Sequence, residues 1–313
     1  MTTNCILSFV FAFISPPSGE AEGAVSFSEH GLFMLNIILG LILFGIALEL
    51  KKEDFISLIK NKKTTLVGLS AHFLLLPLLT FLLVKILHPP PSVALGMILI
   101  GSCPGGNMSN MFTHMAKGNT ALAVGLTSVS HVLAIVMTPF NFSFYGGLDS
   151  ETAALLKTIH LNILDVFQTI VFVIGIPLTV GIFLNYTKPV LAEKLSKVMK
   201  KFSLIAFAVF LIAAFAGNAK VFTANLTTIM PLVMIHNAVA LTGGFLFAKL
   251  MRLEFRDIKT ITFETGVQNA GLGLILIFTF FKGLGGMAIV AASWGIWHLV
   301  SGGALAFWWG RKK

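Results

Sequence analysis

The sequence predicts an all-α membrane protein with ten transmembrane helices, arranged as two inverted five-helix repeats. Three observations lead to this prediction. The 313-residue chain is 56% hydrophobic and only 11% charged, with a mean hydropathy of +0.90, which excludes an ordinary soluble domain. Apolar runs of about 20 residues recur along the chain, and this is the length that crosses a bilayer. Two of these runs are interrupted by polar residues and glycines, at equivalent positions in the two halves.

The spans follow from the apolar runs taken in order. The N-terminal run, Cys5–Ile14, lacks the basic flank of a signal peptide, so we expect a short first membrane helix. If this run is not a full helix, the count is nine rather than ten. The remaining spans are predicted at Gly31–Leu50, Thr64–Leu87, Val93–Met115, Ala121–Phe142, Ile163–Tyr186, Phe202–Ala216, Thr228–Leu250, Thr260–Phe281 and Gly286–Trp309.

Basic residues test this count, because cytoplasmic loops of membrane proteins carry an excess of lysine and arginine. With ten spans, 18 of the 22 basic residues fall on one side, and only Lys85, Lys157, Lys220 and Lys282 fall on the other. We therefore expect a multi-pass protein of the cell membrane, the bacterial inner membrane, with a cytoplasmic C-terminus. The net charge of +9 then reports orientation in the lipid bilayer. Neither a nucleic-acid partner nor a protein partner is indicated.

The two interrupted spans are the fourth and the ninth. Ten spans divide into two sets of five, residues 1–150 and 151–313, within a single transmembrane domain. A repeat with an odd number of spans is inserted upside down, so the fourth and ninth spans run in opposite directions. Matched broken helices of opposite direction indicate an inverted-repeat secondary transporter, with its binding site near the middle of the membrane.

The first break runs from Cys103 to Asn110. A proline and two glycines, residues 104–106, interrupt the helix, and Asn107 can then begin a second half-helix as its N-cap. The N-terminus of this half-helix would lie near the middle of the bilayer. Its free N–H groups favour an anion there, such as a carboxylate or a sulfate.

The second break lies between Glu264 and Gly273 and contains one carboxylate, two amides and three glycines. Asn269 is expected to cap the matching half-helix, so two half-helix N-termini would converge. Glu264 is the acid that we place deepest in the membrane, and its stretch contains no lysine or arginine. Such groups are rare in membrane spans and are usually functional.

The neutral oxygens available near Glu264 indicate which ion this carboxylate would bind. One carboxylate with several neutral oxygens favours a monovalent hard cation such as sodium, whereas zinc would require histidine and cysteine, and calcium more carboxylates. The candidate sources of neutral oxygen are Ser109, Asn110, Thr127 and Gln268.

These motifs are similar to those of a known family. The segments Ser102–Asn110, Lys117–Asn119, Thr127–Ser130 and Glu264–Gly271 resemble the bile acid:sodium symporter family, and the resemblance runs from about Gly31 to the C-terminus. It implies a core domain made of the third to fifth and eighth to tenth spans, and a panel domain made of the others. It also implies a small organic anion as substrate, bile-acid-like or a small carboxylate, and one or two sodium ions behind the crossing of the broken helices.

Residue by residue, the resemblance implies two cation sites and one anion site. The first sodium site would use Ser109, Asn110, Thr127 and Glu264. The second would use the side chains of Glu264 and Gln268, the carbonyl groups of Thr265 and Val267, and the position of His72. The substrate anion would contact Asn107, Asn269 and His298.

Three positions depart from the family pattern. Many relatives have a serine where this chain has Ala123, so one ligand of the first site is missing. Relatives have a glutamine where this chain has His72, and a neutral imidazole is a poor sodium ligand. Because histidine titrates near neutral pH, His72 and Glu264 are alternatively a proton-responsive pair. Leu299 stands where some relatives have asparagine, so the motifs leave the identity of the anion open.

The predicted function is secondary active transport of an organic anion by alternating access, with sodium coupling. A proton-coupled or sodium-independent carrier of the same fold is the alternative. A channel is less favoured, because the polar residues are concentrated at two breaks and do not form a continuous lining. The chain contains neither the His-Glu-x-x-His motif of zinc proteases nor the Gly-x-Ser-x-Gly motif of serine hydrolases, so we do not expect an enzyme.

Overall fold

The computed structural model describes residues 61–158, 163–199, 219–281 and 283–311, together with residues 37, 40–45, 47, 48, 58, 201, 202 and 205. Within 163–174 and 219–226 only the backbone is described. The described residues are helical apart from turns, connecting segments and one isolated backbone bridge. The predicted first span lies outside the described residues, as do much of the second span and nearly all of the seventh.

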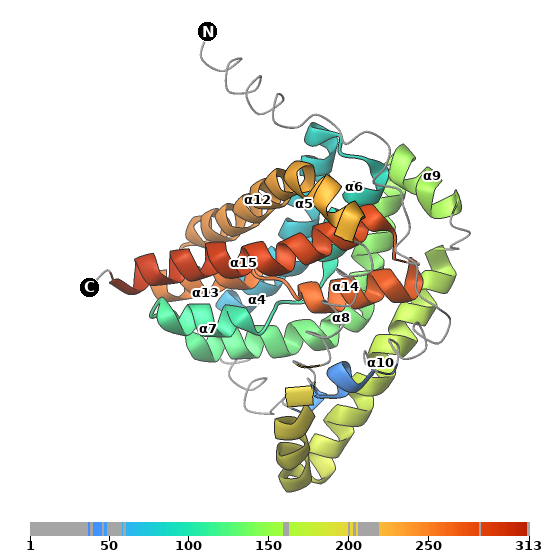
Figure 1. Cartoon of the computed structure of the whole chain (residues 1–313). Helices are drawn as coiled ribbons and strands as arrows, with labels where there is room; N and C mark the ends of the chain where they lie inside the picture. The colour runs from blue at the N-terminus through green and yellow to red at the C-terminus, as the bar shows by residue number, and fades with distance from the viewer. Residues whose placement is uncertain are drawn as a thin grey trace.

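Figure 1 shows the arrangement of the helices. Between residues 62 and 187 they are α4 (Lys62–Ser70), the π-helical turn η2 (Ala71–Leu75), α5 (Leu76–Leu87), α6 (Pro91–Ser102), α7 (Met108–Met115), α8 (Thr120–Leu148), α9 (Ser150–Thr158) and α10 (Ile163–Thr187). From residue 219 onward they are α12 (Ala219–Leu250), α13 (Phe255–Gly266), α14 (Ala270–Phe280) and α15 (Gly285–Arg311).

Among the described residues, four stretches of continuous helix are long and apolar enough to cross a membrane, namely Lys62–Leu87, Thr120–Leu148, Thr227–Leu250 and Gly285–Arg311. Two further apolar helices, α6 and α14, have 12 and 11 residues, so each reaches only about half of a bilayer at about 1.5 Å per residue. The protein is therefore a multi-pass membrane protein with half-helices. The count of ten, the inverted repeat and the division into panel and core stay predictions.

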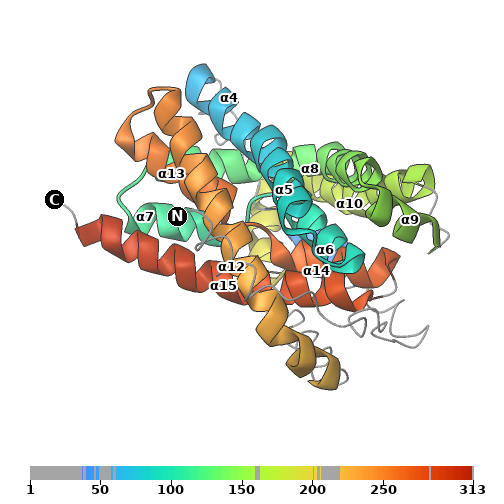
Figure 2. The ribbon, with the colours of Figure 1, turned by 90° about the horizontal axis from the view of Figure 1, so that it is seen from above.

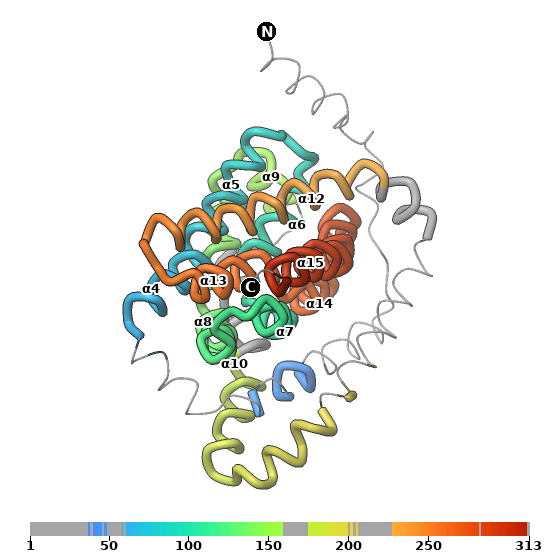
Figure 3. The backbone as a smooth tube through the Cα atoms, turned by 90° about the vertical axis from the view of Figure 1, so that its left-hand side faces the viewer, coloured from blue at the N-terminus to red at the C-terminus, as the bar shows by residue number. Residues whose placement is uncertain are grey.

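In Figure 1, helix α15 lies between α12 on one side and α7 and α8 on the other, and Figure 2 shows that it runs along one edge of the bundle. The half-helices α6 and α14 lie against it and are almost entirely buried, which explains their continuous apolar sequence. In contrast, α10 lies at the periphery (Figure 3) and exposes large apolar side chains such as Ile176, Val180 and Phe183. A bilayer is the environment in which such a face is stable.

The two breaks cross and pair with each other. The backbone N–H of Gly106 donates to the Val267 carbonyl at 2.8 Å, and that of Asn269 donates to the Pro104 carbonyl at 2.9 Å. Gly105 and Gln268 form an antiparallel bridge between these two bonds. Backbone groups that lose their intrahelical hydrogen bonds at one break thus pair with backbone groups at the other break. This pairing avoids the large free-energy cost of unpaired polar groups in hydrocarbon.

The close approach at this crossing requires glycine. A Cβ atom at Gly106 would lie 2.9 Å from the Gln268 carbonyl oxygen, and one at Gly105 would lie 2.8 Å from Glu264 Oε2. The first of these clashes is with backbone, which cannot rotate away. The glycines of the first break are therefore required by the crossing itself, in addition to ending α6.

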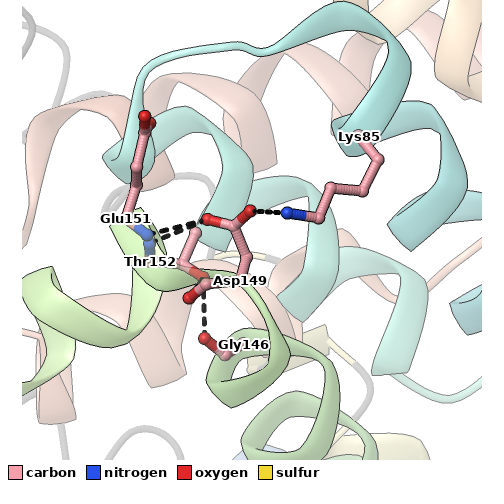
Figure 4. A network of polar contacts seen from close by, with 5 residues as sticks. All are labelled: Lys85, Gly146, Asp149, Glu151 and Thr152. Atoms are coloured by element: carbon pink, nitrogen blue, oxygen red, sulfur yellow. Dashed lines mark hydrogen bonds and ion pairs between the residues drawn. The ribbon is translucent and has the colours of Figure 1, made fainter.

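A cluster at the end of α8 ties three segments together (Figure 4). Asp149 Oδ1 accepts from the backbone N–H groups of Glu151 at 3.0 Å and Thr152 at 3.1 Å, so Asp149 caps α9. Asp149 Oδ2 accepts from Lys85 Nζ of α5, and Thr152 Oγ1 donates to the Gly146 carbonyl at 2.7 Å. Burial alone would raise the pKa of Asp149, but the hydrogen bonds from Lys85 and Thr152 outweigh it and hold the pKa below its ordinary value.

The first prediction concerns Gly106. Gly106→Ala should destabilise the protein by about 1–3 kcal/mol, because the added methyl group overpacks against backbone. Thermal unfolding in detergent measures the effect. Gly303→Ala is the matched control, since the nearest atom to its added Cβ is a ring carbon of Phe112 at 3.7 Å. Equal melting temperatures for the two variants would contradict the steric role of Gly106.

The second prediction concerns Asp149. Asp149→Ala should cost about 1 kcal/mol through loss of the α9 cap, and Glu151→Ala, which leaves the cap intact, should cost less. Because the pKa of Asp149 is lowered in the folded protein, its contribution is present above the unfolded value of 3.8 and is lost as the pH falls through the folded value. The difference in melting temperature between the wild type and Asp149→Ala should therefore be largest near pH 7 and shrink as the pH falls below 3.8. A constant difference would contradict the role of the charge.

Candidate functional site

Glu264 lies in the last turn of α13, two residues before that half-helix ends at the crossing. Its side chain is 2% exposed. The two ion pairs among the described residues, Lys85 with Asp149 and Lys197 with Glu193, are both elsewhere. A buried carboxylate without an ion pair requires hydrogen-bond donors, a proton or a cation.

Two hydroxyl groups from other elements meet this carboxylate. Ser109 Oγ of α7 and Thr127 Oγ1 of α8 both donate to Glu264 Oε1, the second at 2.8 Å. Asn110 Oδ1 lies 3.2 Å from Thr127 Oγ1. The four residues predicted for the first sodium site are therefore brought together from three helices.

This cluster has the chemistry of a hard-cation site. Its donor atoms are carboxylate, hydroxyl and amide oxygens, which are the ligands that sodium takes in common with other hard cations. Within the described residues, no group of three or more histidine, cysteine, aspartate or glutamate side chains is placed to hold a metal ion. Ala123, one turn before Thr127 on α8, is fully buried and offers only a methyl group.

The backbone carbonyl oxygens predicted for the second site already accept hydrogen bonds from protein groups. Gln268 Nε2 donates to the Thr265 carbonyl at 2.8 Å and to the Glu264 carbonyl at 3.2 Å. The Val267 carbonyl accepts from Gly106 at the crossing. Gln268 Oε1 is buried and has no hydrogen-bond partner among the described residues, so it is the free oxygen at this position.

His72 lies in the π-helical turn η2, a rare local geometry that is often found at functional sites. Its Nδ1 is 3.3 Å from the Glu264 carbonyl oxygen, and its Nε2 is 3.0 Å from the Cys103 carbonyl oxygen. The ring therefore bridges the two breaks through their backbones. It contacts the main chain of Glu264, whereas we expected it beside the carboxylate.

No hydrogen bond joins the residues predicted to hold the anion to one another in the described part of the chain. Asn107 stands at the N-cap position of α7 but makes no side-chain cap bond, so the prediction of its capping role was wrong. Its backbone is already helical (φ −56°, ψ −21°), which carries its side chain away from the free N–H groups. Asn269 does cap α14, since its Oδ1 accepts from Leu272 N at 3.0 Å. His298 is buried, and its Nδ1 has no partner within hydrogen-bonding geometry in the described part of the chain.

Two residues on the Thr127 face of α8 were missed as contacts of the site. Ser130 Oγ accepts from the Gly105 N–H at 3.3 Å, and His131 Nε2 lies 3.4 Å from Asn269 Nδ2. They follow Thr127 by three and four residues, so helical spacing places all three on one face. This spacing from Thr127 could have identified both residues from the sequence.

Other polar side chains complete the backbone pairing around the site. Asn237 Nδ2 donates to the carbonyl of Gly266, where α13 ends, at 2.7 Å, and Asn237 Oδ1 accepts from Ser301. Lys259 Nζ donates to the Ala116 carbonyl at the C-terminal end of α7, also at 2.7 Å. A positive charge at this helix end is favourable. The half-helices α7 and α13 are thus linked at both ends.

Comparison with known proteins shows the family of the chain. The profile of the Sodium Bile acid symporter family matches residues 36–225. An uncharacterised sodium-dependent transporter of Bacillus subtilis is 34% identical over 278 residues, which cover 89% of this chain and 83% of that protein.

Relatives are also found in eukaryotes. A probable chloroplastic sodium/metabolite cotransporter of Arabidopsis thaliana is 30% identical over 86% of this chain and 65% of its own length. A sodium-dependent organic anion transporter of Bos taurus is 26% identical over 93% of this chain and 81% of its own length. These relatives are named as transporters and not as enzymes. The chain belongs to the sodium bile acid symporter family of sodium-dependent transporters.

Proposed function

We propose that this protein is a secondary active transporter that moves an organic anion into the cell together with sodium. The main support is the buried Glu264 carboxylate, which meets the hydroxyl groups of Ser109 and Thr127 behind two crossing half-helices. A cation at this position would balance the negative charge of the carboxylate, which has no protein counter-ion among the described residues. The family to which the chain belongs makes sodium the first candidate.

The transport mechanism in this proposal is alternating access. Ten spans form two inverted repeats, residues 1–150 and 151–313, with a core domain that contains both breaks and a panel domain beside it. The matched breaks between α6 and α7 and between α13 and α14 support this arrangement. The protein would work in the bacterial inner membrane with its C-terminus in the cytoplasm.

The anion would bind at the crossing, where α7 and α14 begin. Helix N-termini present free N–H groups and partial positive charge, which suit a carboxylate or a sulfate. We assign Asn107, Asn269 and His298 to this site. The named relatives include a sodium-dependent organic anion transporter and a sodium/metabolite cotransporter, which supports a bile-acid-like anion or a small carboxylate.

We propose one tightly coupled sodium ion, bound by Ser109, Asn110, Thr127 and Glu264. A second ion would use Gln268 Oε1 and the carbonyls of Thr265 and Val267, next to His72. Because those carbonyls accept hydrogen bonds already and His72 faces the Glu264 carbonyl, this second position is the weaker one.

A carrier that is proton-coupled or sodium-independent is the second candidate. The observation in its favour is His72, whose two ring nitrogens each face a carbonyl oxygen. Carbonyl oxygens only accept hydrogen bonds, and a neutral imidazole has a single N–H group to donate, whereas a protonated ring has two. Both carbonyl groups therefore receive a hydrogen bond from His72 only when the ring is protonated. A channel is a third and weaker candidate, and it would conduct without saturation or accumulation.

The third prediction tests sodium coupling. Proteoliposomes should take up taurocholate or a short-chain carboxylate saturably, and accumulate it when an inward sodium gradient replaces a potassium gradient. Glu264→Gln should raise the half-saturating sodium concentration by about tenfold or more, because a charged ligand becomes neutral. Glu254→Gln is the matched control, since Glu254 is an exposed acid at the start of the same half-helix. Sodium-independent uptake by the wild type would contradict sodium coupling, and uptake without saturation would indicate a channel.

The fourth prediction separates sodium from proton coupling at His72. In the sodium-coupled protein, the sodium stimulation of uptake should be equally steep at pH 6 and pH 8. His72→Gln should strengthen the second cation position and make the sodium dependence steeper, since an amide oxygen replaces a ring nitrogen. Uptake that is weakly sodium-dependent in the wild type and rises from pH 8 to pH 6 would instead favour the proton-coupled carrier.

A further inference from the structure

The side chain of His131 lies between the two halves of the proposed site. It belongs to α8, is 2% exposed and has a hydrogen-bonding partner at each ring nitrogen. Nδ1 is 2.7 Å from the Thr127 carbonyl oxygen, and Nε2 is 3.4 Å from Asn269 Nδ2. Thr127 contributes its hydroxyl group to the cation cluster, and Asn269 caps the half-helix that faces the anion.

These contacts define the tautomer of the ring. A carbonyl oxygen only accepts, so Nδ1 carries the hydrogen and donates it to Thr127. The other nitrogen, Nε2, then has a free lone pair. An amide NH₂ group only donates, so Asn269 Nδ2 donates to His131 Nε2. Both bonds are satisfied by a neutral ring.

The orientation of Asn269 depends on this acceptor. Its Oδ1 accepts from the Leu272 N–H at 3.0 Å, and its Nδ2 donates to His131. Without His131, only the cap bond would remain to fix the side chain of this half-buried residue, and its NH₂ group would lose its hydrogen-bond acceptor. His131 thus holds the side chain at the N-terminus of α14 at both of its polar ends.

The turn of α8 that carries His131 also reaches the other break. Ser130 Oγ donates to the Thr127 carbonyl at 2.8 Å and accepts from the Gly105 N–H. The Thr127 carbonyl therefore receives hydrogen bonds from both Ser130 and His131. A cation that binds the Thr127 hydroxyl acts on the same turn that contacts both broken helices.

We propose that His131 is a positioning residue of the anion site, which orients Asn269 for the transported anion and connects it to the cation ligand Thr127. This inference rests on the proposed anion transport and names a residue beyond the predicted site. The proposal includes no contact between the His131 ring and the sodium ion. Removal of the ring should therefore weaken anion recognition and leave sodium binding unchanged.

The fifth prediction uses two side chains that each replace one nitrogen of the ring. Asparagine reproduces the position of Nδ1, and glutamine reproduces that of Nε2. His131→Ala should raise the KM for taurocholate or short-chain carboxylate uptake by about three- to tenfold, the value of one lost hydrogen bond. His131→Gln, which keeps an acceptor for Asn269, should restore the wild-type KM, whereas His131→Asn should not.

Sodium-dependent thermal stabilisation in detergent supplies the second measurement. The half-saturating sodium concentration should stay within about twofold of the wild type in all three variants, because the oxygen ligands are intact. His114→Ala, on the exposed face of α7, controls for the loss of a histidine. An unchanged KM in His131→Ala, or equal rescue by glutamine and asparagine, would overturn the proposal.

Nitrogen NMR of histidine-labelled protein in lipid tests the geometry without a substrate. The signals of His131 are those that are missing from the spectrum of His131→Gln. In the wild type they should show a protonated Nδ1 and an unprotonated Nε2. Asn269→Leu should shift only the Nε2 resonance of His131. A protonated Nε2 in a neutral ring would overturn the proposal. If the wild type transports no anion but the NMR result holds, the proposed function fails while the contact between His131 and Asn269 stands.

Discussion

Unpaired backbone groups in hydrocarbon cost several kcal/mol each, and the centre of this protein is built around that constraint. Both broken helices are interrupted inside the bundle, so their ends release N–H and carbonyl groups among buried residues. The two breaks satisfy each other through the Gly106–Val267 and Pro104–Asn269 bonds, and side chains supply the remaining partners. Asn237 reaches Gly266, and His72 reaches the carbonyls of both breaks. The fold and the candidate site therefore depend on the same set of polar contacts.

The positions of the charged side chains are consistent with this pairing of the two breaks. The described ion pairs lie outside the crossing, while Glu264 is enclosed by hydroxyl groups and glycine backbone. Neutral donors can stabilise a carboxylate but cannot cancel its charge, so a small cation at Glu264 is part of the proposed function. The proposed anion would use the N-termini of α7 and α14, which begin at the same crossing. In this proposal the cation and the anion both contact the elements that form one backbone crossing, which is a physical basis for coupling them.

Much of this could be predicted from local sequence, because breaks in membrane helices are local events. Residues 104–106 cannot continue a helix, and Glu264 cannot lie in lipid, so hydropathy and residue type alone indicate both interruptions and the deepest acid. The meeting of Ser109, Thr127 and Glu264 was expected from family resemblance, and the geometry agrees with it. Asn107 was wrongly expected to cap α7, since capping depends on backbone angles that composition does not set.

The sequence by itself determined the membrane environment, the matched breaks and the acid at their centre, because hydropathy, proline, glycine and charge act along the chain. Only the tertiary structure decided which partners these groups take. The bond from Asn269 to His131 joins residues 138 positions apart, and the bonds of His72 to Cys103 and Glu264 span 31 and 192 positions. Hydrogen bonds require a particular distance and direction in space, which for residues so far apart is set by the packing of whole helices.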